Sequence, residues 1–297
     1  MNALEGYKGP SINLKQITVI SKGWSGDQKY CATSVDGAKY FLRTCSKDKK
    51  YKVETMFKVQ RQLATLGVSV SKPVMFGECA EGFYFLQAWI DGQDAEEVIS
   101  KLDVHKQYRY GLEAGKMLKI IHSIPAPKEQ IGWALRFNEK IDRKIKMFND
   151  CAIKFDGADN IVDYIESNRY LLKDRPQTFQ HGDYHIGNMM MENERLIIID
   201  FDRYDYGDPW EEFNRIVWSA QASPKFATGM IDGYFSHKIP SEFWGLLALY
   251  ICSNLLSSMP WAIPFGESEI NTVRNLAKDV LNWYNNMQSI IPNWYGN

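Results

Sequence analysis

The first third of the chain shows short runs in which apolar and polar residues alternate, a pattern typical of strands. Turn residues separate the runs, and Asp36-Gly37 is a strong hairpin signal. Residues 47–66 instead repeat apolar side chains at helical steps, and Gly67 is a natural end for that helix. The pattern predicts a small lobe with one helix and five strands, at residues 17–20, 29–35, 38–44, 72–78 and 82–90.

Beyond Asp91-Gly92 the pattern becomes mostly helical. We therefore expect an α+β fold in two parts, with residues 1–90 forming the first lobe and residues 91–297 a larger, mostly helical second lobe. Apolar side chains at three- and four-residue steps predict helices at residues 104–124, 137–148, 161–172, 210–220, 226–235, 240–257 and 269–287.

Composition narrows the class of protein without naming it. The chain has 297 residues, 45% hydrophobic and 24% charged, which is an ordinary globular balance with enough length for two lobes. A net charge of -1 gives no reason to expect a nucleic-acid or membrane partner. The 5 dispersed cysteines indicate reduced thiols and a cytoplasmic location. The longest apolar stretch, residues 243–256, is expected to be a buried helix rather than a membrane span.

The candidate chemistry lies between residues 180 and 202. Asp183 and Asn188 sit in a polar loop, and a short apolar run at 196–199 ends at Asp200. A strand that ends there presents the Asp200 carboxylate to a ligand. Phosphoryl transfer needs Mg²⁺ to neutralise the phosphates and one group to orient the attacking hydroxyl. Asp200 and Asn188 offer oxygen ligands for the metal, which leaves Asp183 to accept the hydroxyl proton.

Three motifs in this order carry a resemblance to a known family. They are H-G-D-x-x-x-x-N at residues 181–188, I-D-F at 199–201 and G-D-P at 207–209. The chain resembles the aminoglycoside phosphotransferase family, which is related to choline kinases. The resemblance implies a bilobal, protein-kinase-like fold and Mg²⁺-dependent transfer of the terminal phosphate of ATP or GTP to a small-molecule hydroxyl. An aminoglycoside or another antibiotic, a choline-like amino alcohol or a sugar would be the acceptor.

The resemblance also assigns nucleotide contacts in the first lobe. The turn at residues 21–27 takes the place of the family's nucleotide loop, although it lacks the full G-x-G-x-x-G, and its expected contacts are Ser25 and Gly26. Arg43 stands where such kinases usually carry a phosphate-binding lysine, with Glu54 as its expected partner. Gln87 and Trp89, at the boundary between the lobes, are implied to line the base pocket.

The acceptor is expected between Asp183 and the late helices. A polycationic acceptor requires carboxylates, because buried amines need partners. Aromatic side chains would instead favour choline-like amines through cation–π contacts, or an apolar antibiotic. The sequence leaves this choice open and nominates Asp205, Trp210, Glu211, Trp261, Glu267 and Glu269.

Alternative interpretations compete with this assignment. His181 is expected to brace the loop, Asp202 to form a salt bridge or lie in solvent, and Asp208 to tie the turn before the next helix. A second hypothesis is a nucleotide-binding protein without strong catalysis, which the arginine at position 43 favours. A third treats the His and Asp residues of 181–202 as a metallohydrolase cluster, which leaves Asn188 unexplained.

Overall fold

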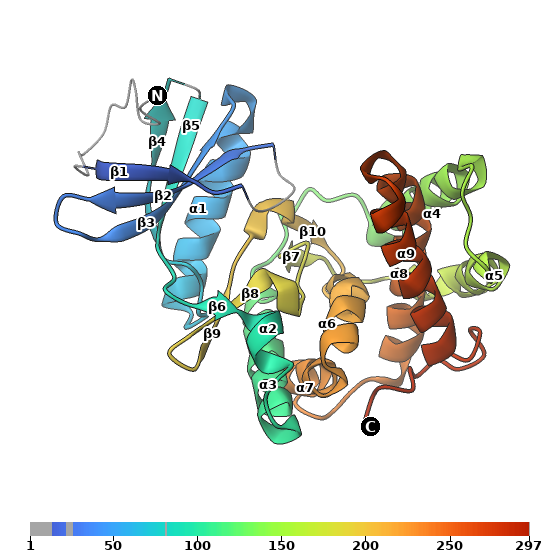
Figure 1. Ribbon diagram of the computed structural model, residues 1–297. Coiled ribbons are helices and arrows are strands. Elements are labelled where there is room, and N and C mark those ends of the chain that lie inside the picture. Colours follow the sequence, from blue (N-terminus) through green and yellow to red (C-terminus); the bar gives the residue numbers. More distant parts are fainter. Residues whose placement is uncertain (1–13, 22–25, 81, 297) are drawn as a thin grey trace. The chain divides into compact units, whose positions relative to one another are not determined.

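The computed structural model describes residues 14–21, 26–80 and 82–296. The chain forms two compact units, drawn with their elements labelled in Figure 1. The first unit contains residues 1–94 and 189–202, and the second contains residues 95–188 and 203–297. The chain therefore leaves the first unit near residue 94, returns to it for a short hairpin, and leaves it again after residue 202.

The first unit is built on a five-stranded antiparallel sheet in the order β1-β2-β3-β5-β4. The five predicted strands are confirmed, with ends that shift by at most three residues. A tight turn at Asp36-Gly37 joins the second and third strands, as the dipeptide predicts, and Gly37 has φ 87°. The strands are β1 (Leu14–Val19), β2 (Gln28–Ser34), β3 (Lys39–Cys45), β4 (Pro73–Cys79) and β5 (Gly82–Ala88).

Alternation along the strands gives this sheet two different faces. One face carries a cluster of buried side chains from β2 to β5, centred on Leu42, Tyr84 and Leu86. The predicted helix is α1 (Lys50–Thr65), which packs on β4 and β5 and buries Val53 and Leu63. Gly67, with φ 86°, follows the end of the helix in the left-handed conformation that suits a C-terminal cap.

A second, small sheet in this unit carries the Asp200 strand. It consists of β6 (Gln93–Asp94), β8 (Met189–Glu192) and β9 (Arg195–Ile198), all antiparallel. Asn193 and Glu194 both have positive φ, as a two-residue hairpin turn requires. Leu196 to Ile198 are buried, whereas Asp200 lies exposed just past the strand. The strand therefore anchors the chain and leaves the carboxylate accessible.

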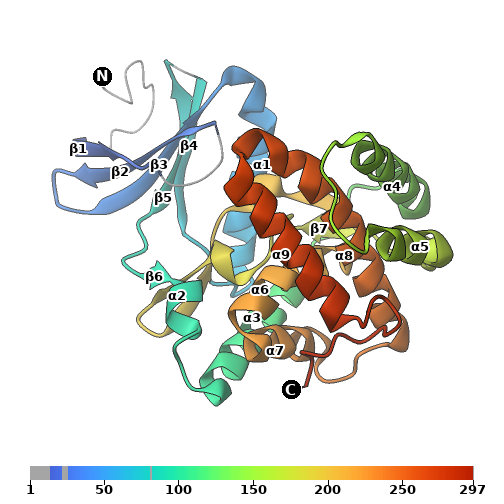
Figure 2. The same cartoon turned by 45° about the vertical axis from the view of Figure 1, so that its right-hand side comes forward.

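The second unit is mostly helical, and Figure 2 shows its helices grouped together. The predicted apolar helix is α8 (Ser241–Ala262), and almost all its side chains from Phe243 to Leu256 are buried. Residues 241–265 are long and apolar enough to cross a membrane, but 67% of the most apolar window is buried in the protein, as in a core helix. The other helices are α2 (Ala95–Ile99), α3 (Val104–Ile121), α4 (Trp133–Asp150), α5 (Ala158–Asn168), α6 (Ile216–Ala222), α7 (Pro224–Phe235) and α9 (Glu267–Trp283).

Two segments of this unit differ from the prediction. The helix expected at 210–220 begins as a 3₁₀ segment, η5 (Glu211–Arg215), and becomes regular only in α6. Two short strands were not expected, β7 (Thr178–Gln180) and β10 (Asp205–Gly207), and they pair antiparallel. Three residues are too few for alternation to signal a strand. This ribbon holds the chain on both sides of the motifs that the sequence singles out.

Candidate functional site

Arg43 lies at the centre of a charge network in the first unit. Its side chain is only 7% exposed. Its Nε donates a hydrogen bond of 2.8 Å to Asp27, and Nη2 contacts the carboxylates of both Asp27 and Asp202. Burial acts to lower the pKa of the Arg43 guanidinium, but the two carboxylates outweigh it and raise that pKa. Within the described part of the chain these contacts use Nε and Nη2 and do not involve Nη1.

The expected pairing of Arg43 with Glu54 is wrong. Glu54 is part-exposed on α1 and forms an ion pair of 2.7 Å with Lys58, one turn further along the same helix. Asp27 and Asp202 take the place that Glu54 was expected to fill. Of the two expectations for Asp202, a salt bridge or a place in solvent, the structure shows the salt bridge.

The strand register explains how Asp27 reaches Arg43. Lys29 of β2 pairs with Arg43 of β3, and Asp27 lies two residues before Lys29 on the same face, which makes it a diagonal neighbour of Arg43. Lys49, just before α1, adds a contact of 2.5 Å to Asp27. Burial raises the pKa of the Asp27 carboxyl, but the hydrogen bond from Lys49 and the charge of Arg43 outweigh it, so the pKa is lowered. Asp27 and Lys49 were missed from sequence.

The other residues expected to contact the nucleotide differ in their burial and in their contacts within the protein. Ser25 lies outside the described residues, and Gly26 is exposed with open space where a Cβ would stand. The side-chain amide of Gln87 is buried and donates to Gln60 at 2.7 Å and to the carbonyl of Ser71 at 3.2 Å. The amide nitrogen of Gln87 is therefore engaged within the protein. Trp89 is part-buried at the end of β5. The assignments of these four residues stay predictions.

Asp200 has an unusual backbone conformation. Its φ of 62° lies in the left-handed region, which aspartate tolerates better than most residues. The residue comes shortly after β9, whose residues Leu196 to Ile198 are buried, and it is exposed. Such a conformation is held only where the flanking structure determines it, and it is common at ligand sites.

The predicted catalytic loop, residues 181–188, lies in the second unit. It directly follows β7, and His181 is fully buried. The ring nitrogen Nδ1 of His181 accepts a hydrogen bond of 3.3 Å from the backbone N–H of Asp183, which is the bracing role expected of it. Gly182 has φ 84°, and a Cβ there would stand 1.8 Å from the carbonyl oxygen of Arg203. Only glycine fits this position.

Glu212 holds the backbone of this loop through hydrogen bonds, and the sequence did not identify it. Its carboxylate is 1% exposed and accepts hydrogen bonds from the backbone N–H of Gly182, at 3.0 Å, and of Tyr184, at 3.2 Å. A buried carboxylate needs such donors, and two backbone amides supply them without using a side chain. Tyr184 in turn donates to the carbonyl of Ala114 in α3, at 2.7 Å. The loop is thus held by backbone contacts on both sides of Asp183.

Asp183 faces cations. Nε of Arg215 lies 3.2 Å from Oδ1 of Asp183, and Nε of Arg203 lies 3.9 Å from Oδ2. Burial acts to raise the pKa of Asp183, but the charge of Arg215 and those of its other basic neighbours outweigh it and lower the pKa. The carboxylate is therefore ionised at neutral pH and able to accept a hydrogen bond from a hydroxyl. Arg215 was also missed, although it follows Glu212 by three residues in the same 3₁₀ segment.

Asn188 is oriented by the same loop. Its Nδ2 donates a hydrogen bond of 2.9 Å to the backbone carbonyl of Asp183, which turns Oδ1 away as the ligand atom. His185 lies beside it, with Nε2 3.3 Å from Nδ2 of Asn188. Burial lowers the pKa of His185 to about 4 despite the nearby Asp183 charge, so the ring is neutral at pH 7. These contacts give His185 a supporting place in the loop.

Asn188 in the second unit and Asp200 in the first each offer a hard oxygen of the kind that Mg²⁺ prefers, one from an amide and one from an exposed carboxylate. Among residues 14–21, 26–80 and 82–296, no three His, Cys, Asp or Glu side chains gather into a metal cluster. The metallohydrolase alternative therefore gains no support from the described residues.

Most nominated acceptor carboxylates already have a partner. Asp205 forms an ion pair with Arg136, and Glu211 one of 3.1 Å with Lys140. Glu267 pairs with Arg274 at 3.0 Å and is exposed. Trp261, shortly before α9, is 42% exposed, and its ring is tilted against that of Phe265. Glu269, at the start of α9, is half-buried. The acidic surface that a polycation needs is thus largely neutralised by the protein itself.

The G-D-P motif is structural in this protein. Asp208 is fully buried and accepts two hydrogen bonds from Arg175, at 2.7 and 3.0 Å, and one of 2.6 Å from Tyr250. It also accepts from the backbone N–H of Trp210 at 3.0 Å, which ties the turn as expected. The guanidinium carbon of Arg175 lies 3.8 Å from the centre of the Trp210 ring. This contact gives Trp210 a packing role rather than a place in the wall of an open acceptor site.

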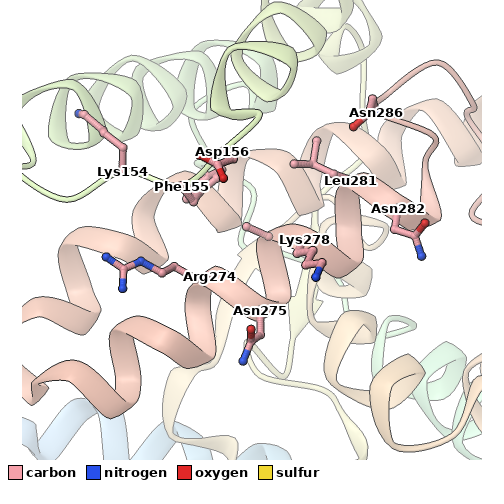
Figure 3. Close-up of a pocket in the computed structure, with 10 residues that line it drawn as sticks. Lys154, Phe155, Asp156, Arg274, Asn275, Lys278, Leu281, Asn282 and Asn286 are labelled. Carbon is pink, nitrogen blue, oxygen red and sulfur yellow. The ribbon is translucent and has the colours of Figure 1, made fainter.

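A separate cavity of about 560 Å³ lies between the α4–α5 connection and α9, and Figure 3 shows its lining. No residue singled out from the sequence lines it. Two of its three basic side chains have partners within the protein, because Nζ of Lys154 donates to the carbonyl of Asn149 at 3.0 Å and Arg274 pairs with Glu267. The lining residues are Lys154, Phe155, Asp156, Arg274, Asn275, Ala277, Lys278, Leu281, Asn282 and Asn286.

Solved structures with the same fold include several small-molecule kinases. Aminoglycoside phosphotransferase APH(2'')-Ib, bound to ADP, matches with 16% identity and a TM-score of 0.62 over 91% of this chain and 95% of that one. The amicoumacin kinase hAmiN matches with 14% identity and a TM-score of 0.64 over 98% and 92%. A choline/ethanolamine kinase family protein from Mesorhizobium loti matches with 16% identity and a TM-score of 0.64 over 96% and 92%. The α+β, bilobal, protein-kinase-like fold is confirmed.

Sequence comparison gives the same answer at the level of the family. No curated protein matches the chain. The family model described as "Phosphotransferase enzyme family" (APH) matches residues 16–246, which is well over half of the chain and includes all three motifs. The chain belongs to this family, and the prediction that it is an enzyme of the kinase type is confirmed.

Proposed function

We propose that the protein transfers the terminal phosphate of ATP or GTP to a hydroxyl group of a small molecule, with Mg²⁺ as the cofactor. The observation that carries this proposal is the catalytic loop. Its backbone is locked by Glu212, and its central carboxylate, Asp183, is held ionised by Arg215. Phosphoryl transfer asks the protein for positioning and electrostatic stabilisation, which is what this loop provides.

Each proposed role follows from a contact described above. Asp183 accepts the hydrogen bond of the attacking hydroxyl and takes up its proton. Asn188 and Asp200 would hold Mg²⁺, which when bound would supply positive charge to neutralise the phosphates. Arg43 offers Nη1 to a phosphate oxygen while Asp27 and Asp202 hold the rest of its guanidinium. Glu54 drops out of the phosphate site because it pairs with Lys58.

The same proposal assigns a separate role to each lobe. Residues 1–90 form the nucleotide-binding lobe and residues 91–297 the catalytic and acceptor-binding lobe. Solved relatives support a nucleotide co-substrate, because APH(2'')-Ib was solved with ADP and hAmiN with AMP-PNP. They also support a small acceptor, because an APH(4)-Ia variant was solved with hygromycin B. Five free cysteines support a cytoplasmic location.

The test is Mg²⁺-dependent release of nucleoside diphosphate from ATP and GTP across a panel of hydroxylated acceptors. Asp183→Asn is the matched variant, because it keeps the shape and the hydrogen bonds of the loop but removes the base. We expect stimulation by one acceptor class and a loss of about 10²–10⁴-fold in kcat in the variant, with nucleotide affinity retained. Full activity of Asp183→Asn contradicts the assignment. Nucleotide binding without any turnover supports the non-catalytic alternative.

A further inference from the structure

Asp200 lies between two anchored positions of the first unit. Two residues before it, the backbone N–H of Ile198 donates a hydrogen bond of 2.8 Å to the carbonyl of Ser69, in the connection from α1 to β4. Two residues after it, the carboxylate of Asp202 contacts Nη2 of Arg43 in β3. The stretch between these anchors contains the left-handed backbone of Asp200, with φ 62°. Both ends of that stretch are thus fixed to other parts of the same unit.

The backbone conformation of Asp200 depends on such support. An aspartate in the left-handed region is less stable than one in the strand or helix regions, and it stays there only where the flanking structure imposes it. On the strand side, Ile198 also forms a parallel bridge with Val70. On the other side Phe201 is 2% exposed, and the next residue forms the ion pair with Arg43. The contact with Arg43 therefore helps to set the direction in which the Asp200 carboxylate points.

Arg43 is itself held firmly in the five-stranded sheet. β3 lies between β2 and β5, and Arg43 pairs with Lys29 on one side and Phe85 on the other. Its Nε donates a hydrogen bond of 2.8 Å to Asp27, and Nη2 contacts the carboxylates of both Asp27 and Asp202. A lysine has one charged nitrogen and no rigid fork, so it cannot hold two carboxylates in this way. An arginine at this position therefore suits a group that joins the sheet to the segment that follows β9.

We propose that Arg43 is a positioning residue for the Mg²⁺ ligand: through Asp202, it fixes the segment that presents the Asp200 carboxylate to the metal. The inference rests on the proposed phosphotransfer and deepens it, because it gives the arginine a part in metal binding beside its contact with phosphate. The two roles make different predictions. Asp202 shares the positioning role with Arg43 but has no share in the phosphate contact, so substitutions at Asp202 separate them.

The experiment measures metal and nucleotide binding separately, without turnover. Mn²⁺ is the probe for the metal, and its binding to the protein with saturating ADP is followed by the relaxation rate of water protons. ADP affinity is measured by calorimetry in EDTA, without metal. Asp202→Asn and Arg43→Lys are the test variants. Arg195→Lys is the matched control, because Arg195 is exposed at the other end of β9.

We expect the Mn²⁺ concentration for half-saturation to rise about tenfold or more in Asp202→Asn and in Arg43→Lys, as is usual when a residue that orients a metal ligand is lost. Arg195→Lys should bind Mn²⁺ as the wild type does. Metal-free ADP affinity should fall in Arg43→Lys, which alters the phosphate contact, and stay at the wild-type value in Asp202→Asn. A general loss of structure would instead weaken ADP binding in both. Unchanged Mn²⁺ binding in either test variant, or an equal loss of ADP affinity in Asp202→Asn, overturns the proposal.

A double variant tests whether Asp202 binds the metal directly. Arg43→Lys combined with Asp202→Asn should weaken Mn²⁺ binding no more than the stronger single variant, because both changes break the same contact. Effects that multiply mean that Asp202 acts on the metal by itself, and they overturn the proposal. Asp200→Asn tests the proposed function: if it leaves Mn²⁺ binding intact, the metal assignment fails together with the inference. If it removes Mn²⁺ binding while the test variants keep it, the inference alone fails.

Discussion

Each unit contains a candidate site residue that is held by side chains of opposite charge, and the two sites are built in opposite ways. In the first unit Arg43 is the held group: two carboxylates, Asp27 and Asp202, surround it and it is 7% exposed. In the second unit the carboxylate Asp183 is the held group, and Arg215 contacts it through Nε alone at 3.2 Å. One site is organised around a cation and the other around an anion.

The comparison shows two ways of holding a charged side chain in place, one by side-chain charges and one by backbone hydrogen bonds. The Arg43 site depends on side-chain charges, so its geometry should fail when a charge is removed. The Asp183 loop depends on backbone hydrogen bonds to Glu212, so its geometry should survive a change of charge at Asp183 and fail when the acceptor beneath it changes. Substitutions at the two sites therefore separate electrostatic from structural support.

The largest effect is expected from Arg43→Met. Removing the guanidinium leaves Asp27, which is 5% exposed, and Asp202 facing each other without their common partner. Breaking a buried pair in this way costs about 3–5 kcal/mol of unfolding free energy. Urea unfolding measures the loss. Arg43→Lys is the control and should lose less, because a point charge remains although it cannot reach both carboxylates in a fork. Wild-type stability of Arg43→Met would show that the carboxylates are not held by this residue.

Glu212→Gln tests the other kind of support. The neutral amide accepts more weakly than the carboxylate and turns a donor toward the N–H groups of Gly182 and Tyr184. We expect a loss of about 1–3 kcal/mol in stability and a larger fall in kcat than in nucleotide affinity. Thermal unfolding and steady-state kinetics on the same preparation separate the two. An unchanged kcat would mean that the loop keeps its shape without this acceptor.

The pH dependence of the first site has a definite sign. The folded-state pKa of Asp27 is lowered: burial raises it, but Lys49 and Arg43 outweigh that effect. Its stabilising contribution is therefore present above the unfolded value, about pH 4, and is lost as the pH falls through the folded pKa. We expect a Tm gap of about 2–4 °C between the wild type and Asp27→Asn at pH 7, which closes in acid. A gap that stays constant down to pH 2.5 would contradict the coupling.

The sequence predicted the parts of this protein that depend on local pattern. Alternation located the five strands, and the spacing of the motifs located the Asp200 strand and the loop that carries Asp183. It did not reveal Asp27 as the partner of Arg43, because that contact depends on the register of β2 against β3. Glu212 escaped for a similar reason: its carboxylate turns inward to backbone N–H groups, and no side-chain motif marks a bond to the backbone.

The smallest effect is expected from Glu54→Gln, which decides between the two proposed partners of Arg43. Glu54 is part-exposed and paired only with Lys58, four residues away on the same helix, and such surface pairs contribute little. We expect less than about a twofold change in KM for ATP and no measurable shift in Tm. Asp202→Asn is the matched comparison, because it removes one carboxylate charge from Arg43 itself. If Glu54→Gln impaired nucleotide binding and Asp202→Asn did not, Glu54 would have to contact Arg43 during the reaction. The contacts of Arg43 with Asp27 and Asp202 would then belong only to the resting protein.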